Sequence, residues 1–193
     1  GWEERWRAFH RPVVVGPLWV GPPWESAPPG LTTVVIDPGR AFGTGAHATT
    51  RLCLAYLREL PRGGLLDVGC GSGVLAVAAA KLGFMPVVAL DNDLAAVESA
   101  RANASANGVE VDVRLADVVT DRLPDVAVAI VNIARDPVER FAERFDGRLV
   151  VASGYLVAER PAPAGWRAAE RRVADAWAAD VLLRDGDANA RVG

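Results

Sequence analysis

From residue 65 onward the chain alternates between short apolar runs and longer runs in which apolar residues recur every three or four positions. The short runs, such as Val87–Leu90, have no polar alternation, which is typical of strands buried on both faces of a parallel sheet. The longer runs are typical of helices that cover such a sheet. The pattern predicts strands at 65–68, 87–90, 111–115, 126–131 and 148–152, and helices at 74–82, 94–107 and 138–145. A further helix is predicted before this part of the chain, at 49–60, where Pro61 ends it.

The C-terminal part departs from this alternation. The stretch PAPAGW stands where the next long helix is expected, and its prolines disfavour one. Trp166–Val173 and Trp177–Leu183 then resemble two closely joined strands. Because so short a connection joins only antiparallel neighbours, we predict an antiparallel pair at this end of the sheet.

The N-terminal part is interrupted by prolines. The stretch PLWVGPPWESAPPG predicts no regular structure and an extended arm that lies over the domain. A short strand is predicted next, at Thr32–Ile36. We therefore expect an arm or linker at 1–30, one domain at 31–185 and a flexible tail at 186–193.

Composition narrows the function classes. A chain of 193 residues that is 51% hydrophobic fits one globular domain, and a net charge of -3 gives no electrostatic footprint for nucleic acid. Cys53 and Cys70 are the only cysteines, so neither a disulfide framework nor a cysteine zinc site is indicated. No run reaches the roughly 18 apolar residues that span a bilayer. We expect a soluble, cytoplasmic protein without a metal, a membrane partner or a direct nucleic-acid partner.

The candidate chemistry begins in LLDVGCGSGVLAVAAAKLG, Leu65–Gly83. A strand that reaches Asp67 turns through three glycines and opens a helix at Val74. The turn places backbone N–H groups at a helix N-terminus beside the carboxyl ends of the strands, where open α/β sheets bind ligands. The next strand ends near Asp91, whose carboxylate can accept hydrogen bonds from the two hydroxyls of a ribose. These features predict a nucleoside ligand.

Two nucleoside cofactors fit this turn. Gly71, Gly73 and Ala76 satisfy the dinucleotide pattern G-x-G-x-x-A, with Asp91 at the expected distance. Asp67 favours the other class, because its carboxylate would repel a pyrophosphate and attract a sulfonium donor that carries an α-amino group. The residues favour a methyl donor, while a dinucleotide and a ligand-free turn remain open.

Four stretches carry a resemblance to known proteins. DVGCGSG followed by LDND resembles the class I S-adenosylmethionine-dependent methyltransferases. DPGRAFGTGAHATT, Asp37–Thr50, is similar to the corresponding loop of the PrmA family, the methyltransferases of large-subunit ribosomal protein eleven, and VNIARD and GRLVVASGYL resemble that family's fourth and fifth strands. The resemblance extends from about Trp2 to Leu183. It implies a Rossmann-like α/β fold with a seven-stranded, mostly parallel sheet, an antiparallel last strand and helices on both faces.

The resemblance also implies a cofactor and site residues. The cofactor is S-adenosylmethionine. Matched by position, the donor-binding residues are Thr50, Gly69, Asp91 and Asn132, with Thr44, Asp67 and Gly71 beside them. For Asp117 an adenine contact and a plain surface acid remain open, and for His47 a site role and a structural hydrogen bond remain open.

Asn132 is also the candidate for positioning the acceptor. Amide and adenine N-methyltransferases often have Asn/Asp-Pro-Pro-Tyr/Phe here, whereas this chain has Asn132, Ile133, Ala134 and Arg135. Without a ring to stack on a planar acceptor, an aliphatic amine is favoured. The expected activity is N-methylation of protein lysine or α-amino groups, with a ribosomal protein as candidate partner.

Two alternatives remain open beside this activity. One is a small-molecule methyltransferase, and the other is a donor-binding regulator without catalysis. The family's usual form carries an N-terminal recognition domain, and this chain begins near the linker to the catalytic domain. We therefore expect that domain to be absent, which bears on the choice between a protein and a small-molecule substrate.

Overall fold

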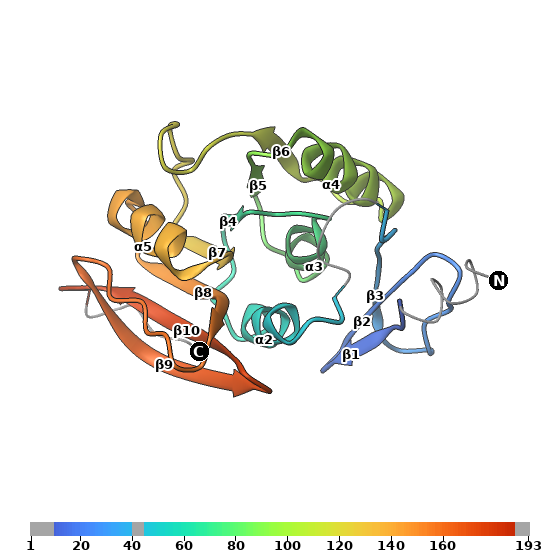
Figure 1. Ribbon diagram of the computed structural model, residues 1–193. Coiled ribbons are helices and arrows are strands. Elements are labelled where there is room, and N and C mark those ends of the chain that lie inside the picture. The colour runs from blue at the N-terminus through green and yellow to red at the C-terminus, as the bar shows by residue number, and fades with distance from the viewer. Residues whose placement is uncertain (1–9, 40–44, 188–193) are drawn as a thin grey trace.

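The computed structural model describes residues 10–39 and 45–187. These residues form a seven-stranded sheet with helices on both faces, and a separate three-stranded sheet near the N-terminal end of the described chain (Figure 1).

The large sheet is mostly parallel. In spatial order its strands are β6 (Asp112–Leu115), β5 (Val87–Asp91), β4 (Leu65–Val68), β7 (Val128–Asn132), β8 (Leu149–Leu156), β10 (Trp177–Arg184) and β9 (Trp166–Ala174). The first five are parallel to one another. The last strand of the chain, β10, lies antiparallel to both of its neighbours. The predicted fold class is confirmed, including the antiparallel last strand.

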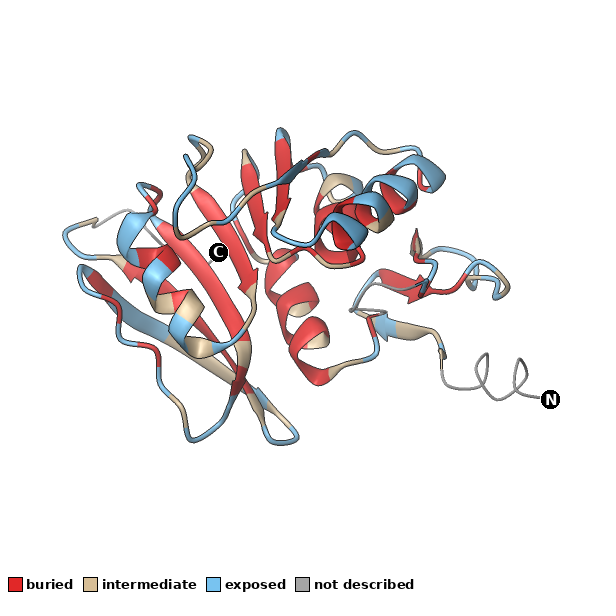
Figure 2. Cartoon of the chain, turned by 45° about the horizontal axis from the view of Figure 1, so that its top comes forward, coloured by how far each residue is buried: buried red, intermediate tan, exposed pale blue. Residues whose placement is uncertain are grey.

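The helices divide unevenly between the two faces. Helices α2 (Ala48–Leu57), α3 (Val74–Lys81) and α4 (Leu94–Ala106) pack with Leu65 of β4 in one apolar core. Helix α5 (Arg135–Arg144) packs with Leu66 of β4 in the other. Successive strand residues point to opposite faces, so the apolar runs supply both cores at once. Figure 2 shows the central strands as almost wholly buried.

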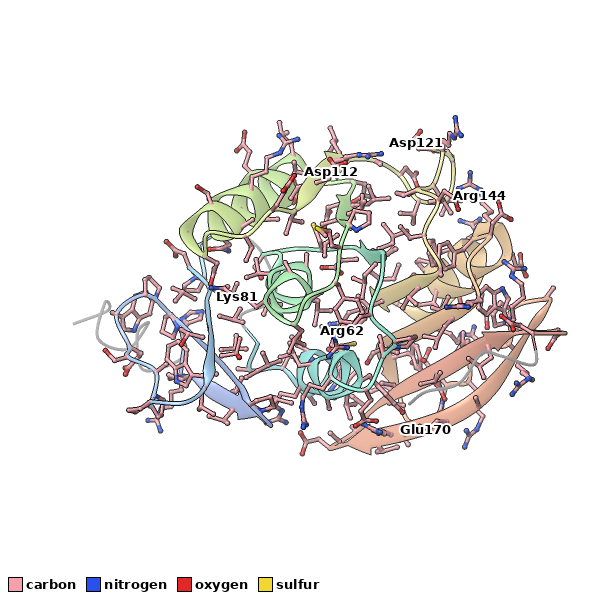
Figure 3. The ribbon with its side chains drawn as sticks, turned by 180° about the vertical axis from the view of Figure 1, so that it is seen from behind. Arg62, Lys81, Asp112, Asp121, Arg144 and Glu170 are labelled. Carbon is pink, nitrogen blue, oxygen red and sulfur yellow. The ribbon has the colours of Figure 1, made fainter. Side chains whose placement is uncertain are left out.

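Besides the short turn between β9 and β10, two connections of the large sheet contain no helix. Between β8 and β9 the chain runs through Pro161 and Pro163 as a loop, as predicted. Between β6 and β7, residues 116–127 form another loop, which lies over the face that carries α5. The Arg144 guanidinium at the end of α5 donates to carbonyl oxygens of this loop, those of Val118, Thr120 and Asp121 (Figure 3). A side chain therefore secures the loop where many sheets would have a helix.

The prediction of no regular structure for the proline-rich arm is wrong for part of it. The chain forms β1 (Val13–Val15) and β2 (Leu18–Gly21), and β2 pairs in parallel with β3 (Thr32–Val35). The prolines stand before and after β2 rather than within it, so no ladder N–H is lost. All four residues of β2 are buried, and its leucine and valine join the core of α2 and α3, which stabilises the small sheet.

Several boundaries differ from the predicted ones. Helix α5 begins at Arg135 rather than Val138, because Pro137 is tolerated in the first turn, where N–H groups have no intrahelical partner. Strand β8 continues to Leu156, and α2 ends at Leu57. Within the described ranges, none of the helices combines the length and the apolar character needed to cross a membrane.

Candidate functional site

The glycine turn joins β4 to α3 as predicted, and α4 supports it. Gly73, the N-cap of α3, has a left-handed φ of 81°. A Cβ at this position would lie 2.9 Å from the Cβ of Ala100 on α4. Glycine therefore meets two needs here, a conformation that other residues rarely adopt and close contact with the neighbouring helix.

The structure brings Gly71 and Asp91 together. The Gly71 N–H donates to Asp91 Oδ2 over 2.9 Å, and the Asp93 N–H donates to Asp91 Oδ1 over 3.0 Å. Because each carboxylate oxygen accepts two hydrogen bonds, both oxygens retain capacity for a ligand hydroxyl. The carboxylate is thus held in place by the backbone while it remains able to bind a ribose.

Asp67 lies beneath the turn rather than at its surface. Its side chain is 1% exposed, and its Oδ2 accepts the Ala76 N–H over 3.0 Å. Its Oδ1 is buried and has no hydrogen-bond partner among the described residues. Burial, helped by the nearby Asp91 charge, raises the pKa of Asp67 to about 7, and the hydrogen bond from the Ala76 N–H acts in the opposite direction. A cation brought close to Oδ1 would favour the ionised carboxylate.

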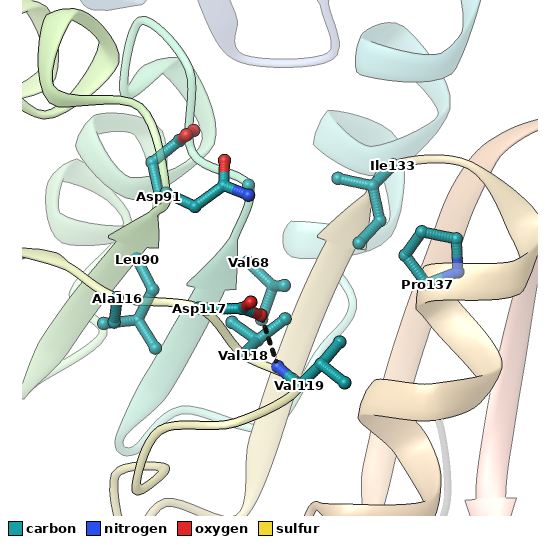
Figure 4. Close-up of a pocket in the computed structure, with 11 residues that line it drawn as sticks. Val68, Leu90, Asp91, Ala116, Asp117, Val118, Val119, Ile133 and Pro137 are labelled. Carbon is teal, nitrogen blue, oxygen red and sulfur yellow. Dashed lines mark hydrogen bonds between the residues drawn. The ribbon is translucent and has the colours of Figure 1, made fainter.

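A cavity of about 310 Å³ lies beside Asp91 (Figure 4). Figure 4 shows Val68 and Leu90 on one side and Ile133 and Pro137 on the other. It is lined by Val68, Gly69, Leu90, Asp91, Asn92, Ala116, Asp117, Val118, Val119, Ile133 and Pro137. An apolar slot with a few polar groups at its edge is typical of a site for a planar ring such as a nucleobase.

Three of the predicted residues line this cavity, namely Gly69, Asp91 and Asp117. Asp117 Oδ1 accepts the Val119 N–H over 2.8 Å, so this carboxylate also shapes the loop. The sequence reasoning missed Asn92 and Ile133. Asn92 directly follows Asp91, and Ile133 directly follows Asn132. Their positions next to predicted site residues could have indicated them.

A second group of predicted residues gathers at the end of β7. The Asn132 side-chain amide donates to Thr50 Oγ1 over 3.4 Å, across 82 positions of sequence. Thr50 is 1% exposed on α2 and Asn132 is half-buried. The two side chains therefore form one unit, although they come from different elements. Thr44 lies outside the described residues.

His47 has a structural role in this geometry. Its side chain caps α2 by accepting the Thr49 N–H, and its Nδ1 lies 2.8 Å from Thr49 Oγ1. Its ring packs against the Trp177 ring in a T-shaped arrangement, with centroids 4.8 Å apart. His47 thus connects the start of α2 to the start of β10.

Gly154 of β8 allows the chain after β7 to approach closely. Asn132 pairs with Ser153, and Gly154 has a φ of 105°. A Cβ on Gly154 would overlap the backbone of Ile133. The position of the Asn132 end of β7 therefore depends on a glycine in the neighbouring strand, which the sequence reasoning did not single out.

The described residues contain no group of three or more His, Cys, Asp or Glu side chains that could hold a metal ion. They provide a largely apolar cavity, a carboxylate with free acceptor capacity at its lining, a buried carboxylate with an unpaired oxygen and, at the end of the adjacent strand β7, a side-chain amide. This set can bind a cationic nucleoside and present it to a second molecule.

Comparison with known proteins agrees with this geometry. A family model described as "Ribosomal protein L11 methyltransferase (PrmA)" matches residues 1–159. A "Ribosomal protein L11 methyltransferase" of Symbiobacterium thermophilum is 44% identical over 196 residues, which covers 96% of this chain and 62% of the relative. The protein of the same name from Shewanella pealeana is 42% identical over 167 residues, covering 80% of this chain and 56% of the relative.

Solved structures share the fold. A crystal structure titled as a ribosomal protein L11 methylase from Lactobacillus delbrueckii subsp. bulgaricus has a TM-score of 0.81 at 25% identity, covering 91% of this chain and 99% of that chain. The tRNA (uracil-54, C5)-methyltransferase of Pyrococcus abyssi, titled as a complex with S-adenosyl-L-homocysteine, has a TM-score of 0.63 at 20% identity and covers 77% of this chain and 40% of that one. The chain spans less than two thirds of the length of the curated relatives above.

Proposed function

Because the chain belongs to the ribosomal protein L11 methyltransferase (PrmA) family, we propose that it transfers a methyl group from S-adenosylmethionine to an aliphatic amine of a protein, with ribosomal protein L11 as the first candidate substrate. One observation carries the proposal. The Asp91 carboxylate is bonded to the glycine turn at the edge of a cavity, above the buried carboxylate of Asp67.

The residues present fit the donor. Asp91 retains acceptor capacity for the two ribose hydroxyls, and the apolar cavity beside it fits the adenine ring. The unpaired Oδ1 of Asp67 suits the α-ammonium group, because a buried carboxylate without a partner is stabilised strongly by a nearby positive charge. When bound, the donor supplies a methyl group on a positively charged sulfur. Asp67 thus gives a reason to favour this donor over a dinucleotide.

The acceptor must lose a proton before it can attack. At pH 7 a lysine amine with a reference pKa near 10.4 is neutral at a cost of about 4 to 5 kcal/mol. A site that is partly dry and already holds a positive donor lowers that cost. Asn132 donates through its Nδ2 to Thr50, so its Oδ1 keeps its acceptor capacity for an amine N–H. The role of Asn132 is to align the amine with the methyl group, which is the main requirement of an in-line transfer.

Transfer of labelled methyl groups tests the proposal. Purified protein, labelled S-adenosylmethionine and purified ribosomal protein L11 should give labelled L11, with the label on lysine or on the α-amine after hydrolysis. At a donor concentration near the wild-type dissociation constant, Asp91→Ala should give little label. Asp185→Ala, which removes an exposed carboxylate after β10, is the matched control and should behave as the wild type.

Other outcomes would contradict the proposal in distinct ways. Label on glutamine or adenine with none on an amine would overturn the acceptor class. Label only in a small-molecule extract would favour the small-molecule alternative. Donor binding without any labelled product would favour a regulator.

A further inference from the structure

Two buried asparagines lie one turn apart at the end of helix α4, Asn103 within the helix and Asn107 as its C-cap, and they are 3% and 9% exposed. Asparagine is a poor helix former in the helix interior, where Asn103 lies, and any buried amide is costly unless its hydrogen bonds are made. Both side chains are bonded, and both reach away from their own helix toward β3 and the residues after it. Their partners, however, differ in a way that concerns the donor site.

Asn107 bonds to a strand. Its Oδ1 accepts the Val35 N–H over 2.9 Å, and its Nδ2 donates to the Val35 carbonyl oxygen over 2.6 Å and to that of Asn103 over 2.8 Å. The side-chain amide therefore satisfies both backbone groups of Val35, as a neighbouring strand would. Its contacts with other elements end at β3.

Asn103 bonds to the glycine turn as well. Its Oδ1 accepts the Asp37 N–H over 3.0 Å, and its Nδ2 donates to the Ser72 carbonyl oxygen over 2.8 Å. Ser72 lies between Gly71, whose N–H holds Asp91, and Gly73, which packs on Ala100 one turn before Asn103. Helix α4 therefore holds the turn at two points, one by packing and one by a hydrogen bond.

We infer that Asn103 is a positioning residue for the donor site, acting through the Ser72 carbonyl to set the Gly71 N–H and with it the Asp91 carboxylate. This inference rests on the proposed binding of S-adenosylmethionine. Asn103 is not among the residues that line the cavity, and its side-chain amide bonds to Ser72 and Asp37, so we expect its effect to pass through the turn.

Three variants test the inference by calorimetry with S-adenosylmethionine. Asn103→Ala removes both bonds, and Asn103→Asp keeps an acceptor for the Asp37 N–H while it loses the donor to Ser72. Asn107→Ala is the matched control, because it removes buried bonds from the same helix without touching the turn. We expect the dissociation constant to rise about tenfold in both Asn103 variants and less than twofold in Asn107→Ala. The melting temperature should fall in both alanine variants.

Equal weakening in Asn107→Ala and Asn103→Ala would overturn the inference, because the effect would then follow overall stability. Wild-type affinity in folded Asn103→Asp would overturn it as well. Hydrogen exchange of the Gly71 and Gly73 amides, measured without ligand, separates this result from failure of the proposed function. Faster exchange in Asn103→Asp than in Asn107→Ala would support the positioning role even if the wild type bound no donor, and equal exchange would contradict it.

Discussion

The proposed donor side of this site and its proposed acceptor side are built differently. We assign Thr50 and Asn132, which the resemblance matches to donor-binding residues, to the acceptor side. On the donor side, the N–H of Gly71 meets the carboxylate of Asp91 across 20 positions of sequence, within one strand–helix–strand unit. On the acceptor side, Asn132 meets Thr50 across 82 positions, between elements that no short motif connects. The hydrogen bond between the residues that are closer in sequence is also the shorter one. It measures 2.9 Å between Gly71 and Asp91, against 3.4 Å between Asn132 and Thr50.

If this assignment is right, one set of residues binds the cofactor and a different set selects the substrate. Backbone groups and a held carboxylate form the proposed donor side, so we expect it to recognise features common to all molecules of the donor's class. The acceptor side depends on side chains whose positions are set by packing between α2, β7 and β8. Substitutions on the two sides should therefore change different measured quantities.

The largest effect is expected at Asp91. Asp91→Ala removes the acceptor of the Gly71 N–H and the proposed acceptor of the ribose, so the dissociation constant of S-adenosylmethionine should rise about 100-fold, or ~3 kcal/mol. Calorimetry with the donor measures this change. Asp91→Asn retains one oxygen and should lie between the wild type and the alanine variant. Unchanged affinity in a folded Asp91→Ala protein would remove Asp91 from the donor site.

Substitution of Gly154 tests how much the close contact between β8 and the Ile133 backbone, next to Asn132, contributes to stability. Gly154→Ala places a Cβ against the Ile133 backbone at a positive φ, and we expect the free energy of unfolding to fall by about 2 to 3 kcal/mol. Gly83→Ala is the control, since Gly83 also has a positive φ but no neighbour within 4 Å, and it should cost about 1 kcal/mol. Denaturant unfolding compares them. Equal losses would show that contact with Ile133 contributes nothing beyond the backbone conformation.

Substitution of Asn132 distinguishes alignment of the acceptor from binding of the donor. In Asn132→Ala we expect kcat for methyl transfer to fall about 30-fold, because the acceptor loses its orientation, while donor affinity changes less than threefold. Steady-state kinetics and calorimetry on the same preparation separate the two. A loss of donor affinity as large as that in Asp91→Ala would assign Asn132 to the donor side instead.

The smallest expected effect is the dependence of donor affinity on pH, through the ionisation of Asp67. Its pKa is raised to about 7, so the ionised form that attracts the donor's ammonium group becomes more populated as the pH rises. Between pH 6 and pH 7 the dissociation constant of S-adenosylmethionine should fall about fivefold. Calorimetry at both pH values measures this, and Asp67→Asn should abolish the dependence. A dependence that persists in Asp67→Asn would belong to another group.

The same group affects stability with the opposite sign. An acid whose pKa is higher in the folded state binds more protons there than in the unfolded state. The free energy of unfolding of the ligand-free protein should therefore fall as the pH rises from about 4 to 7. Asp67→Asn should remove that slope in urea titrations, and it keeps an oxygen that can accept the Ala76 N–H.

Short stretches of sequence predicted those elements that depend on interactions between residues close together in the chain. The apolar runs of β4, β5 and β7 and the turn that opens α3 were predicted because burial on both faces and a glycine-rich helix start leave marks within a few residues. Gly71 and Asp91 followed for the same reason. The strand at Leu18–Gly21 was missed because its stability comes from burial against α2 and α3, which outweighs the nearby prolines.

By itself, the sequence determined the parallel sheet, the glycine turn and the carboxylate that faces it, since each depends on the order of residues within one strand–helix–strand unit. Only the tertiary structure decided that Asp67 is buried with an unpaired oxygen, that Thr50 and Asn132 form one unit, and that Gly154 and Asn103 hold neighbouring segments in place. The physical reason is distance along the chain. Burial and hydrogen bonding between remote segments depend on how whole elements pack, and packing leaves no pattern in any one stretch of sequence.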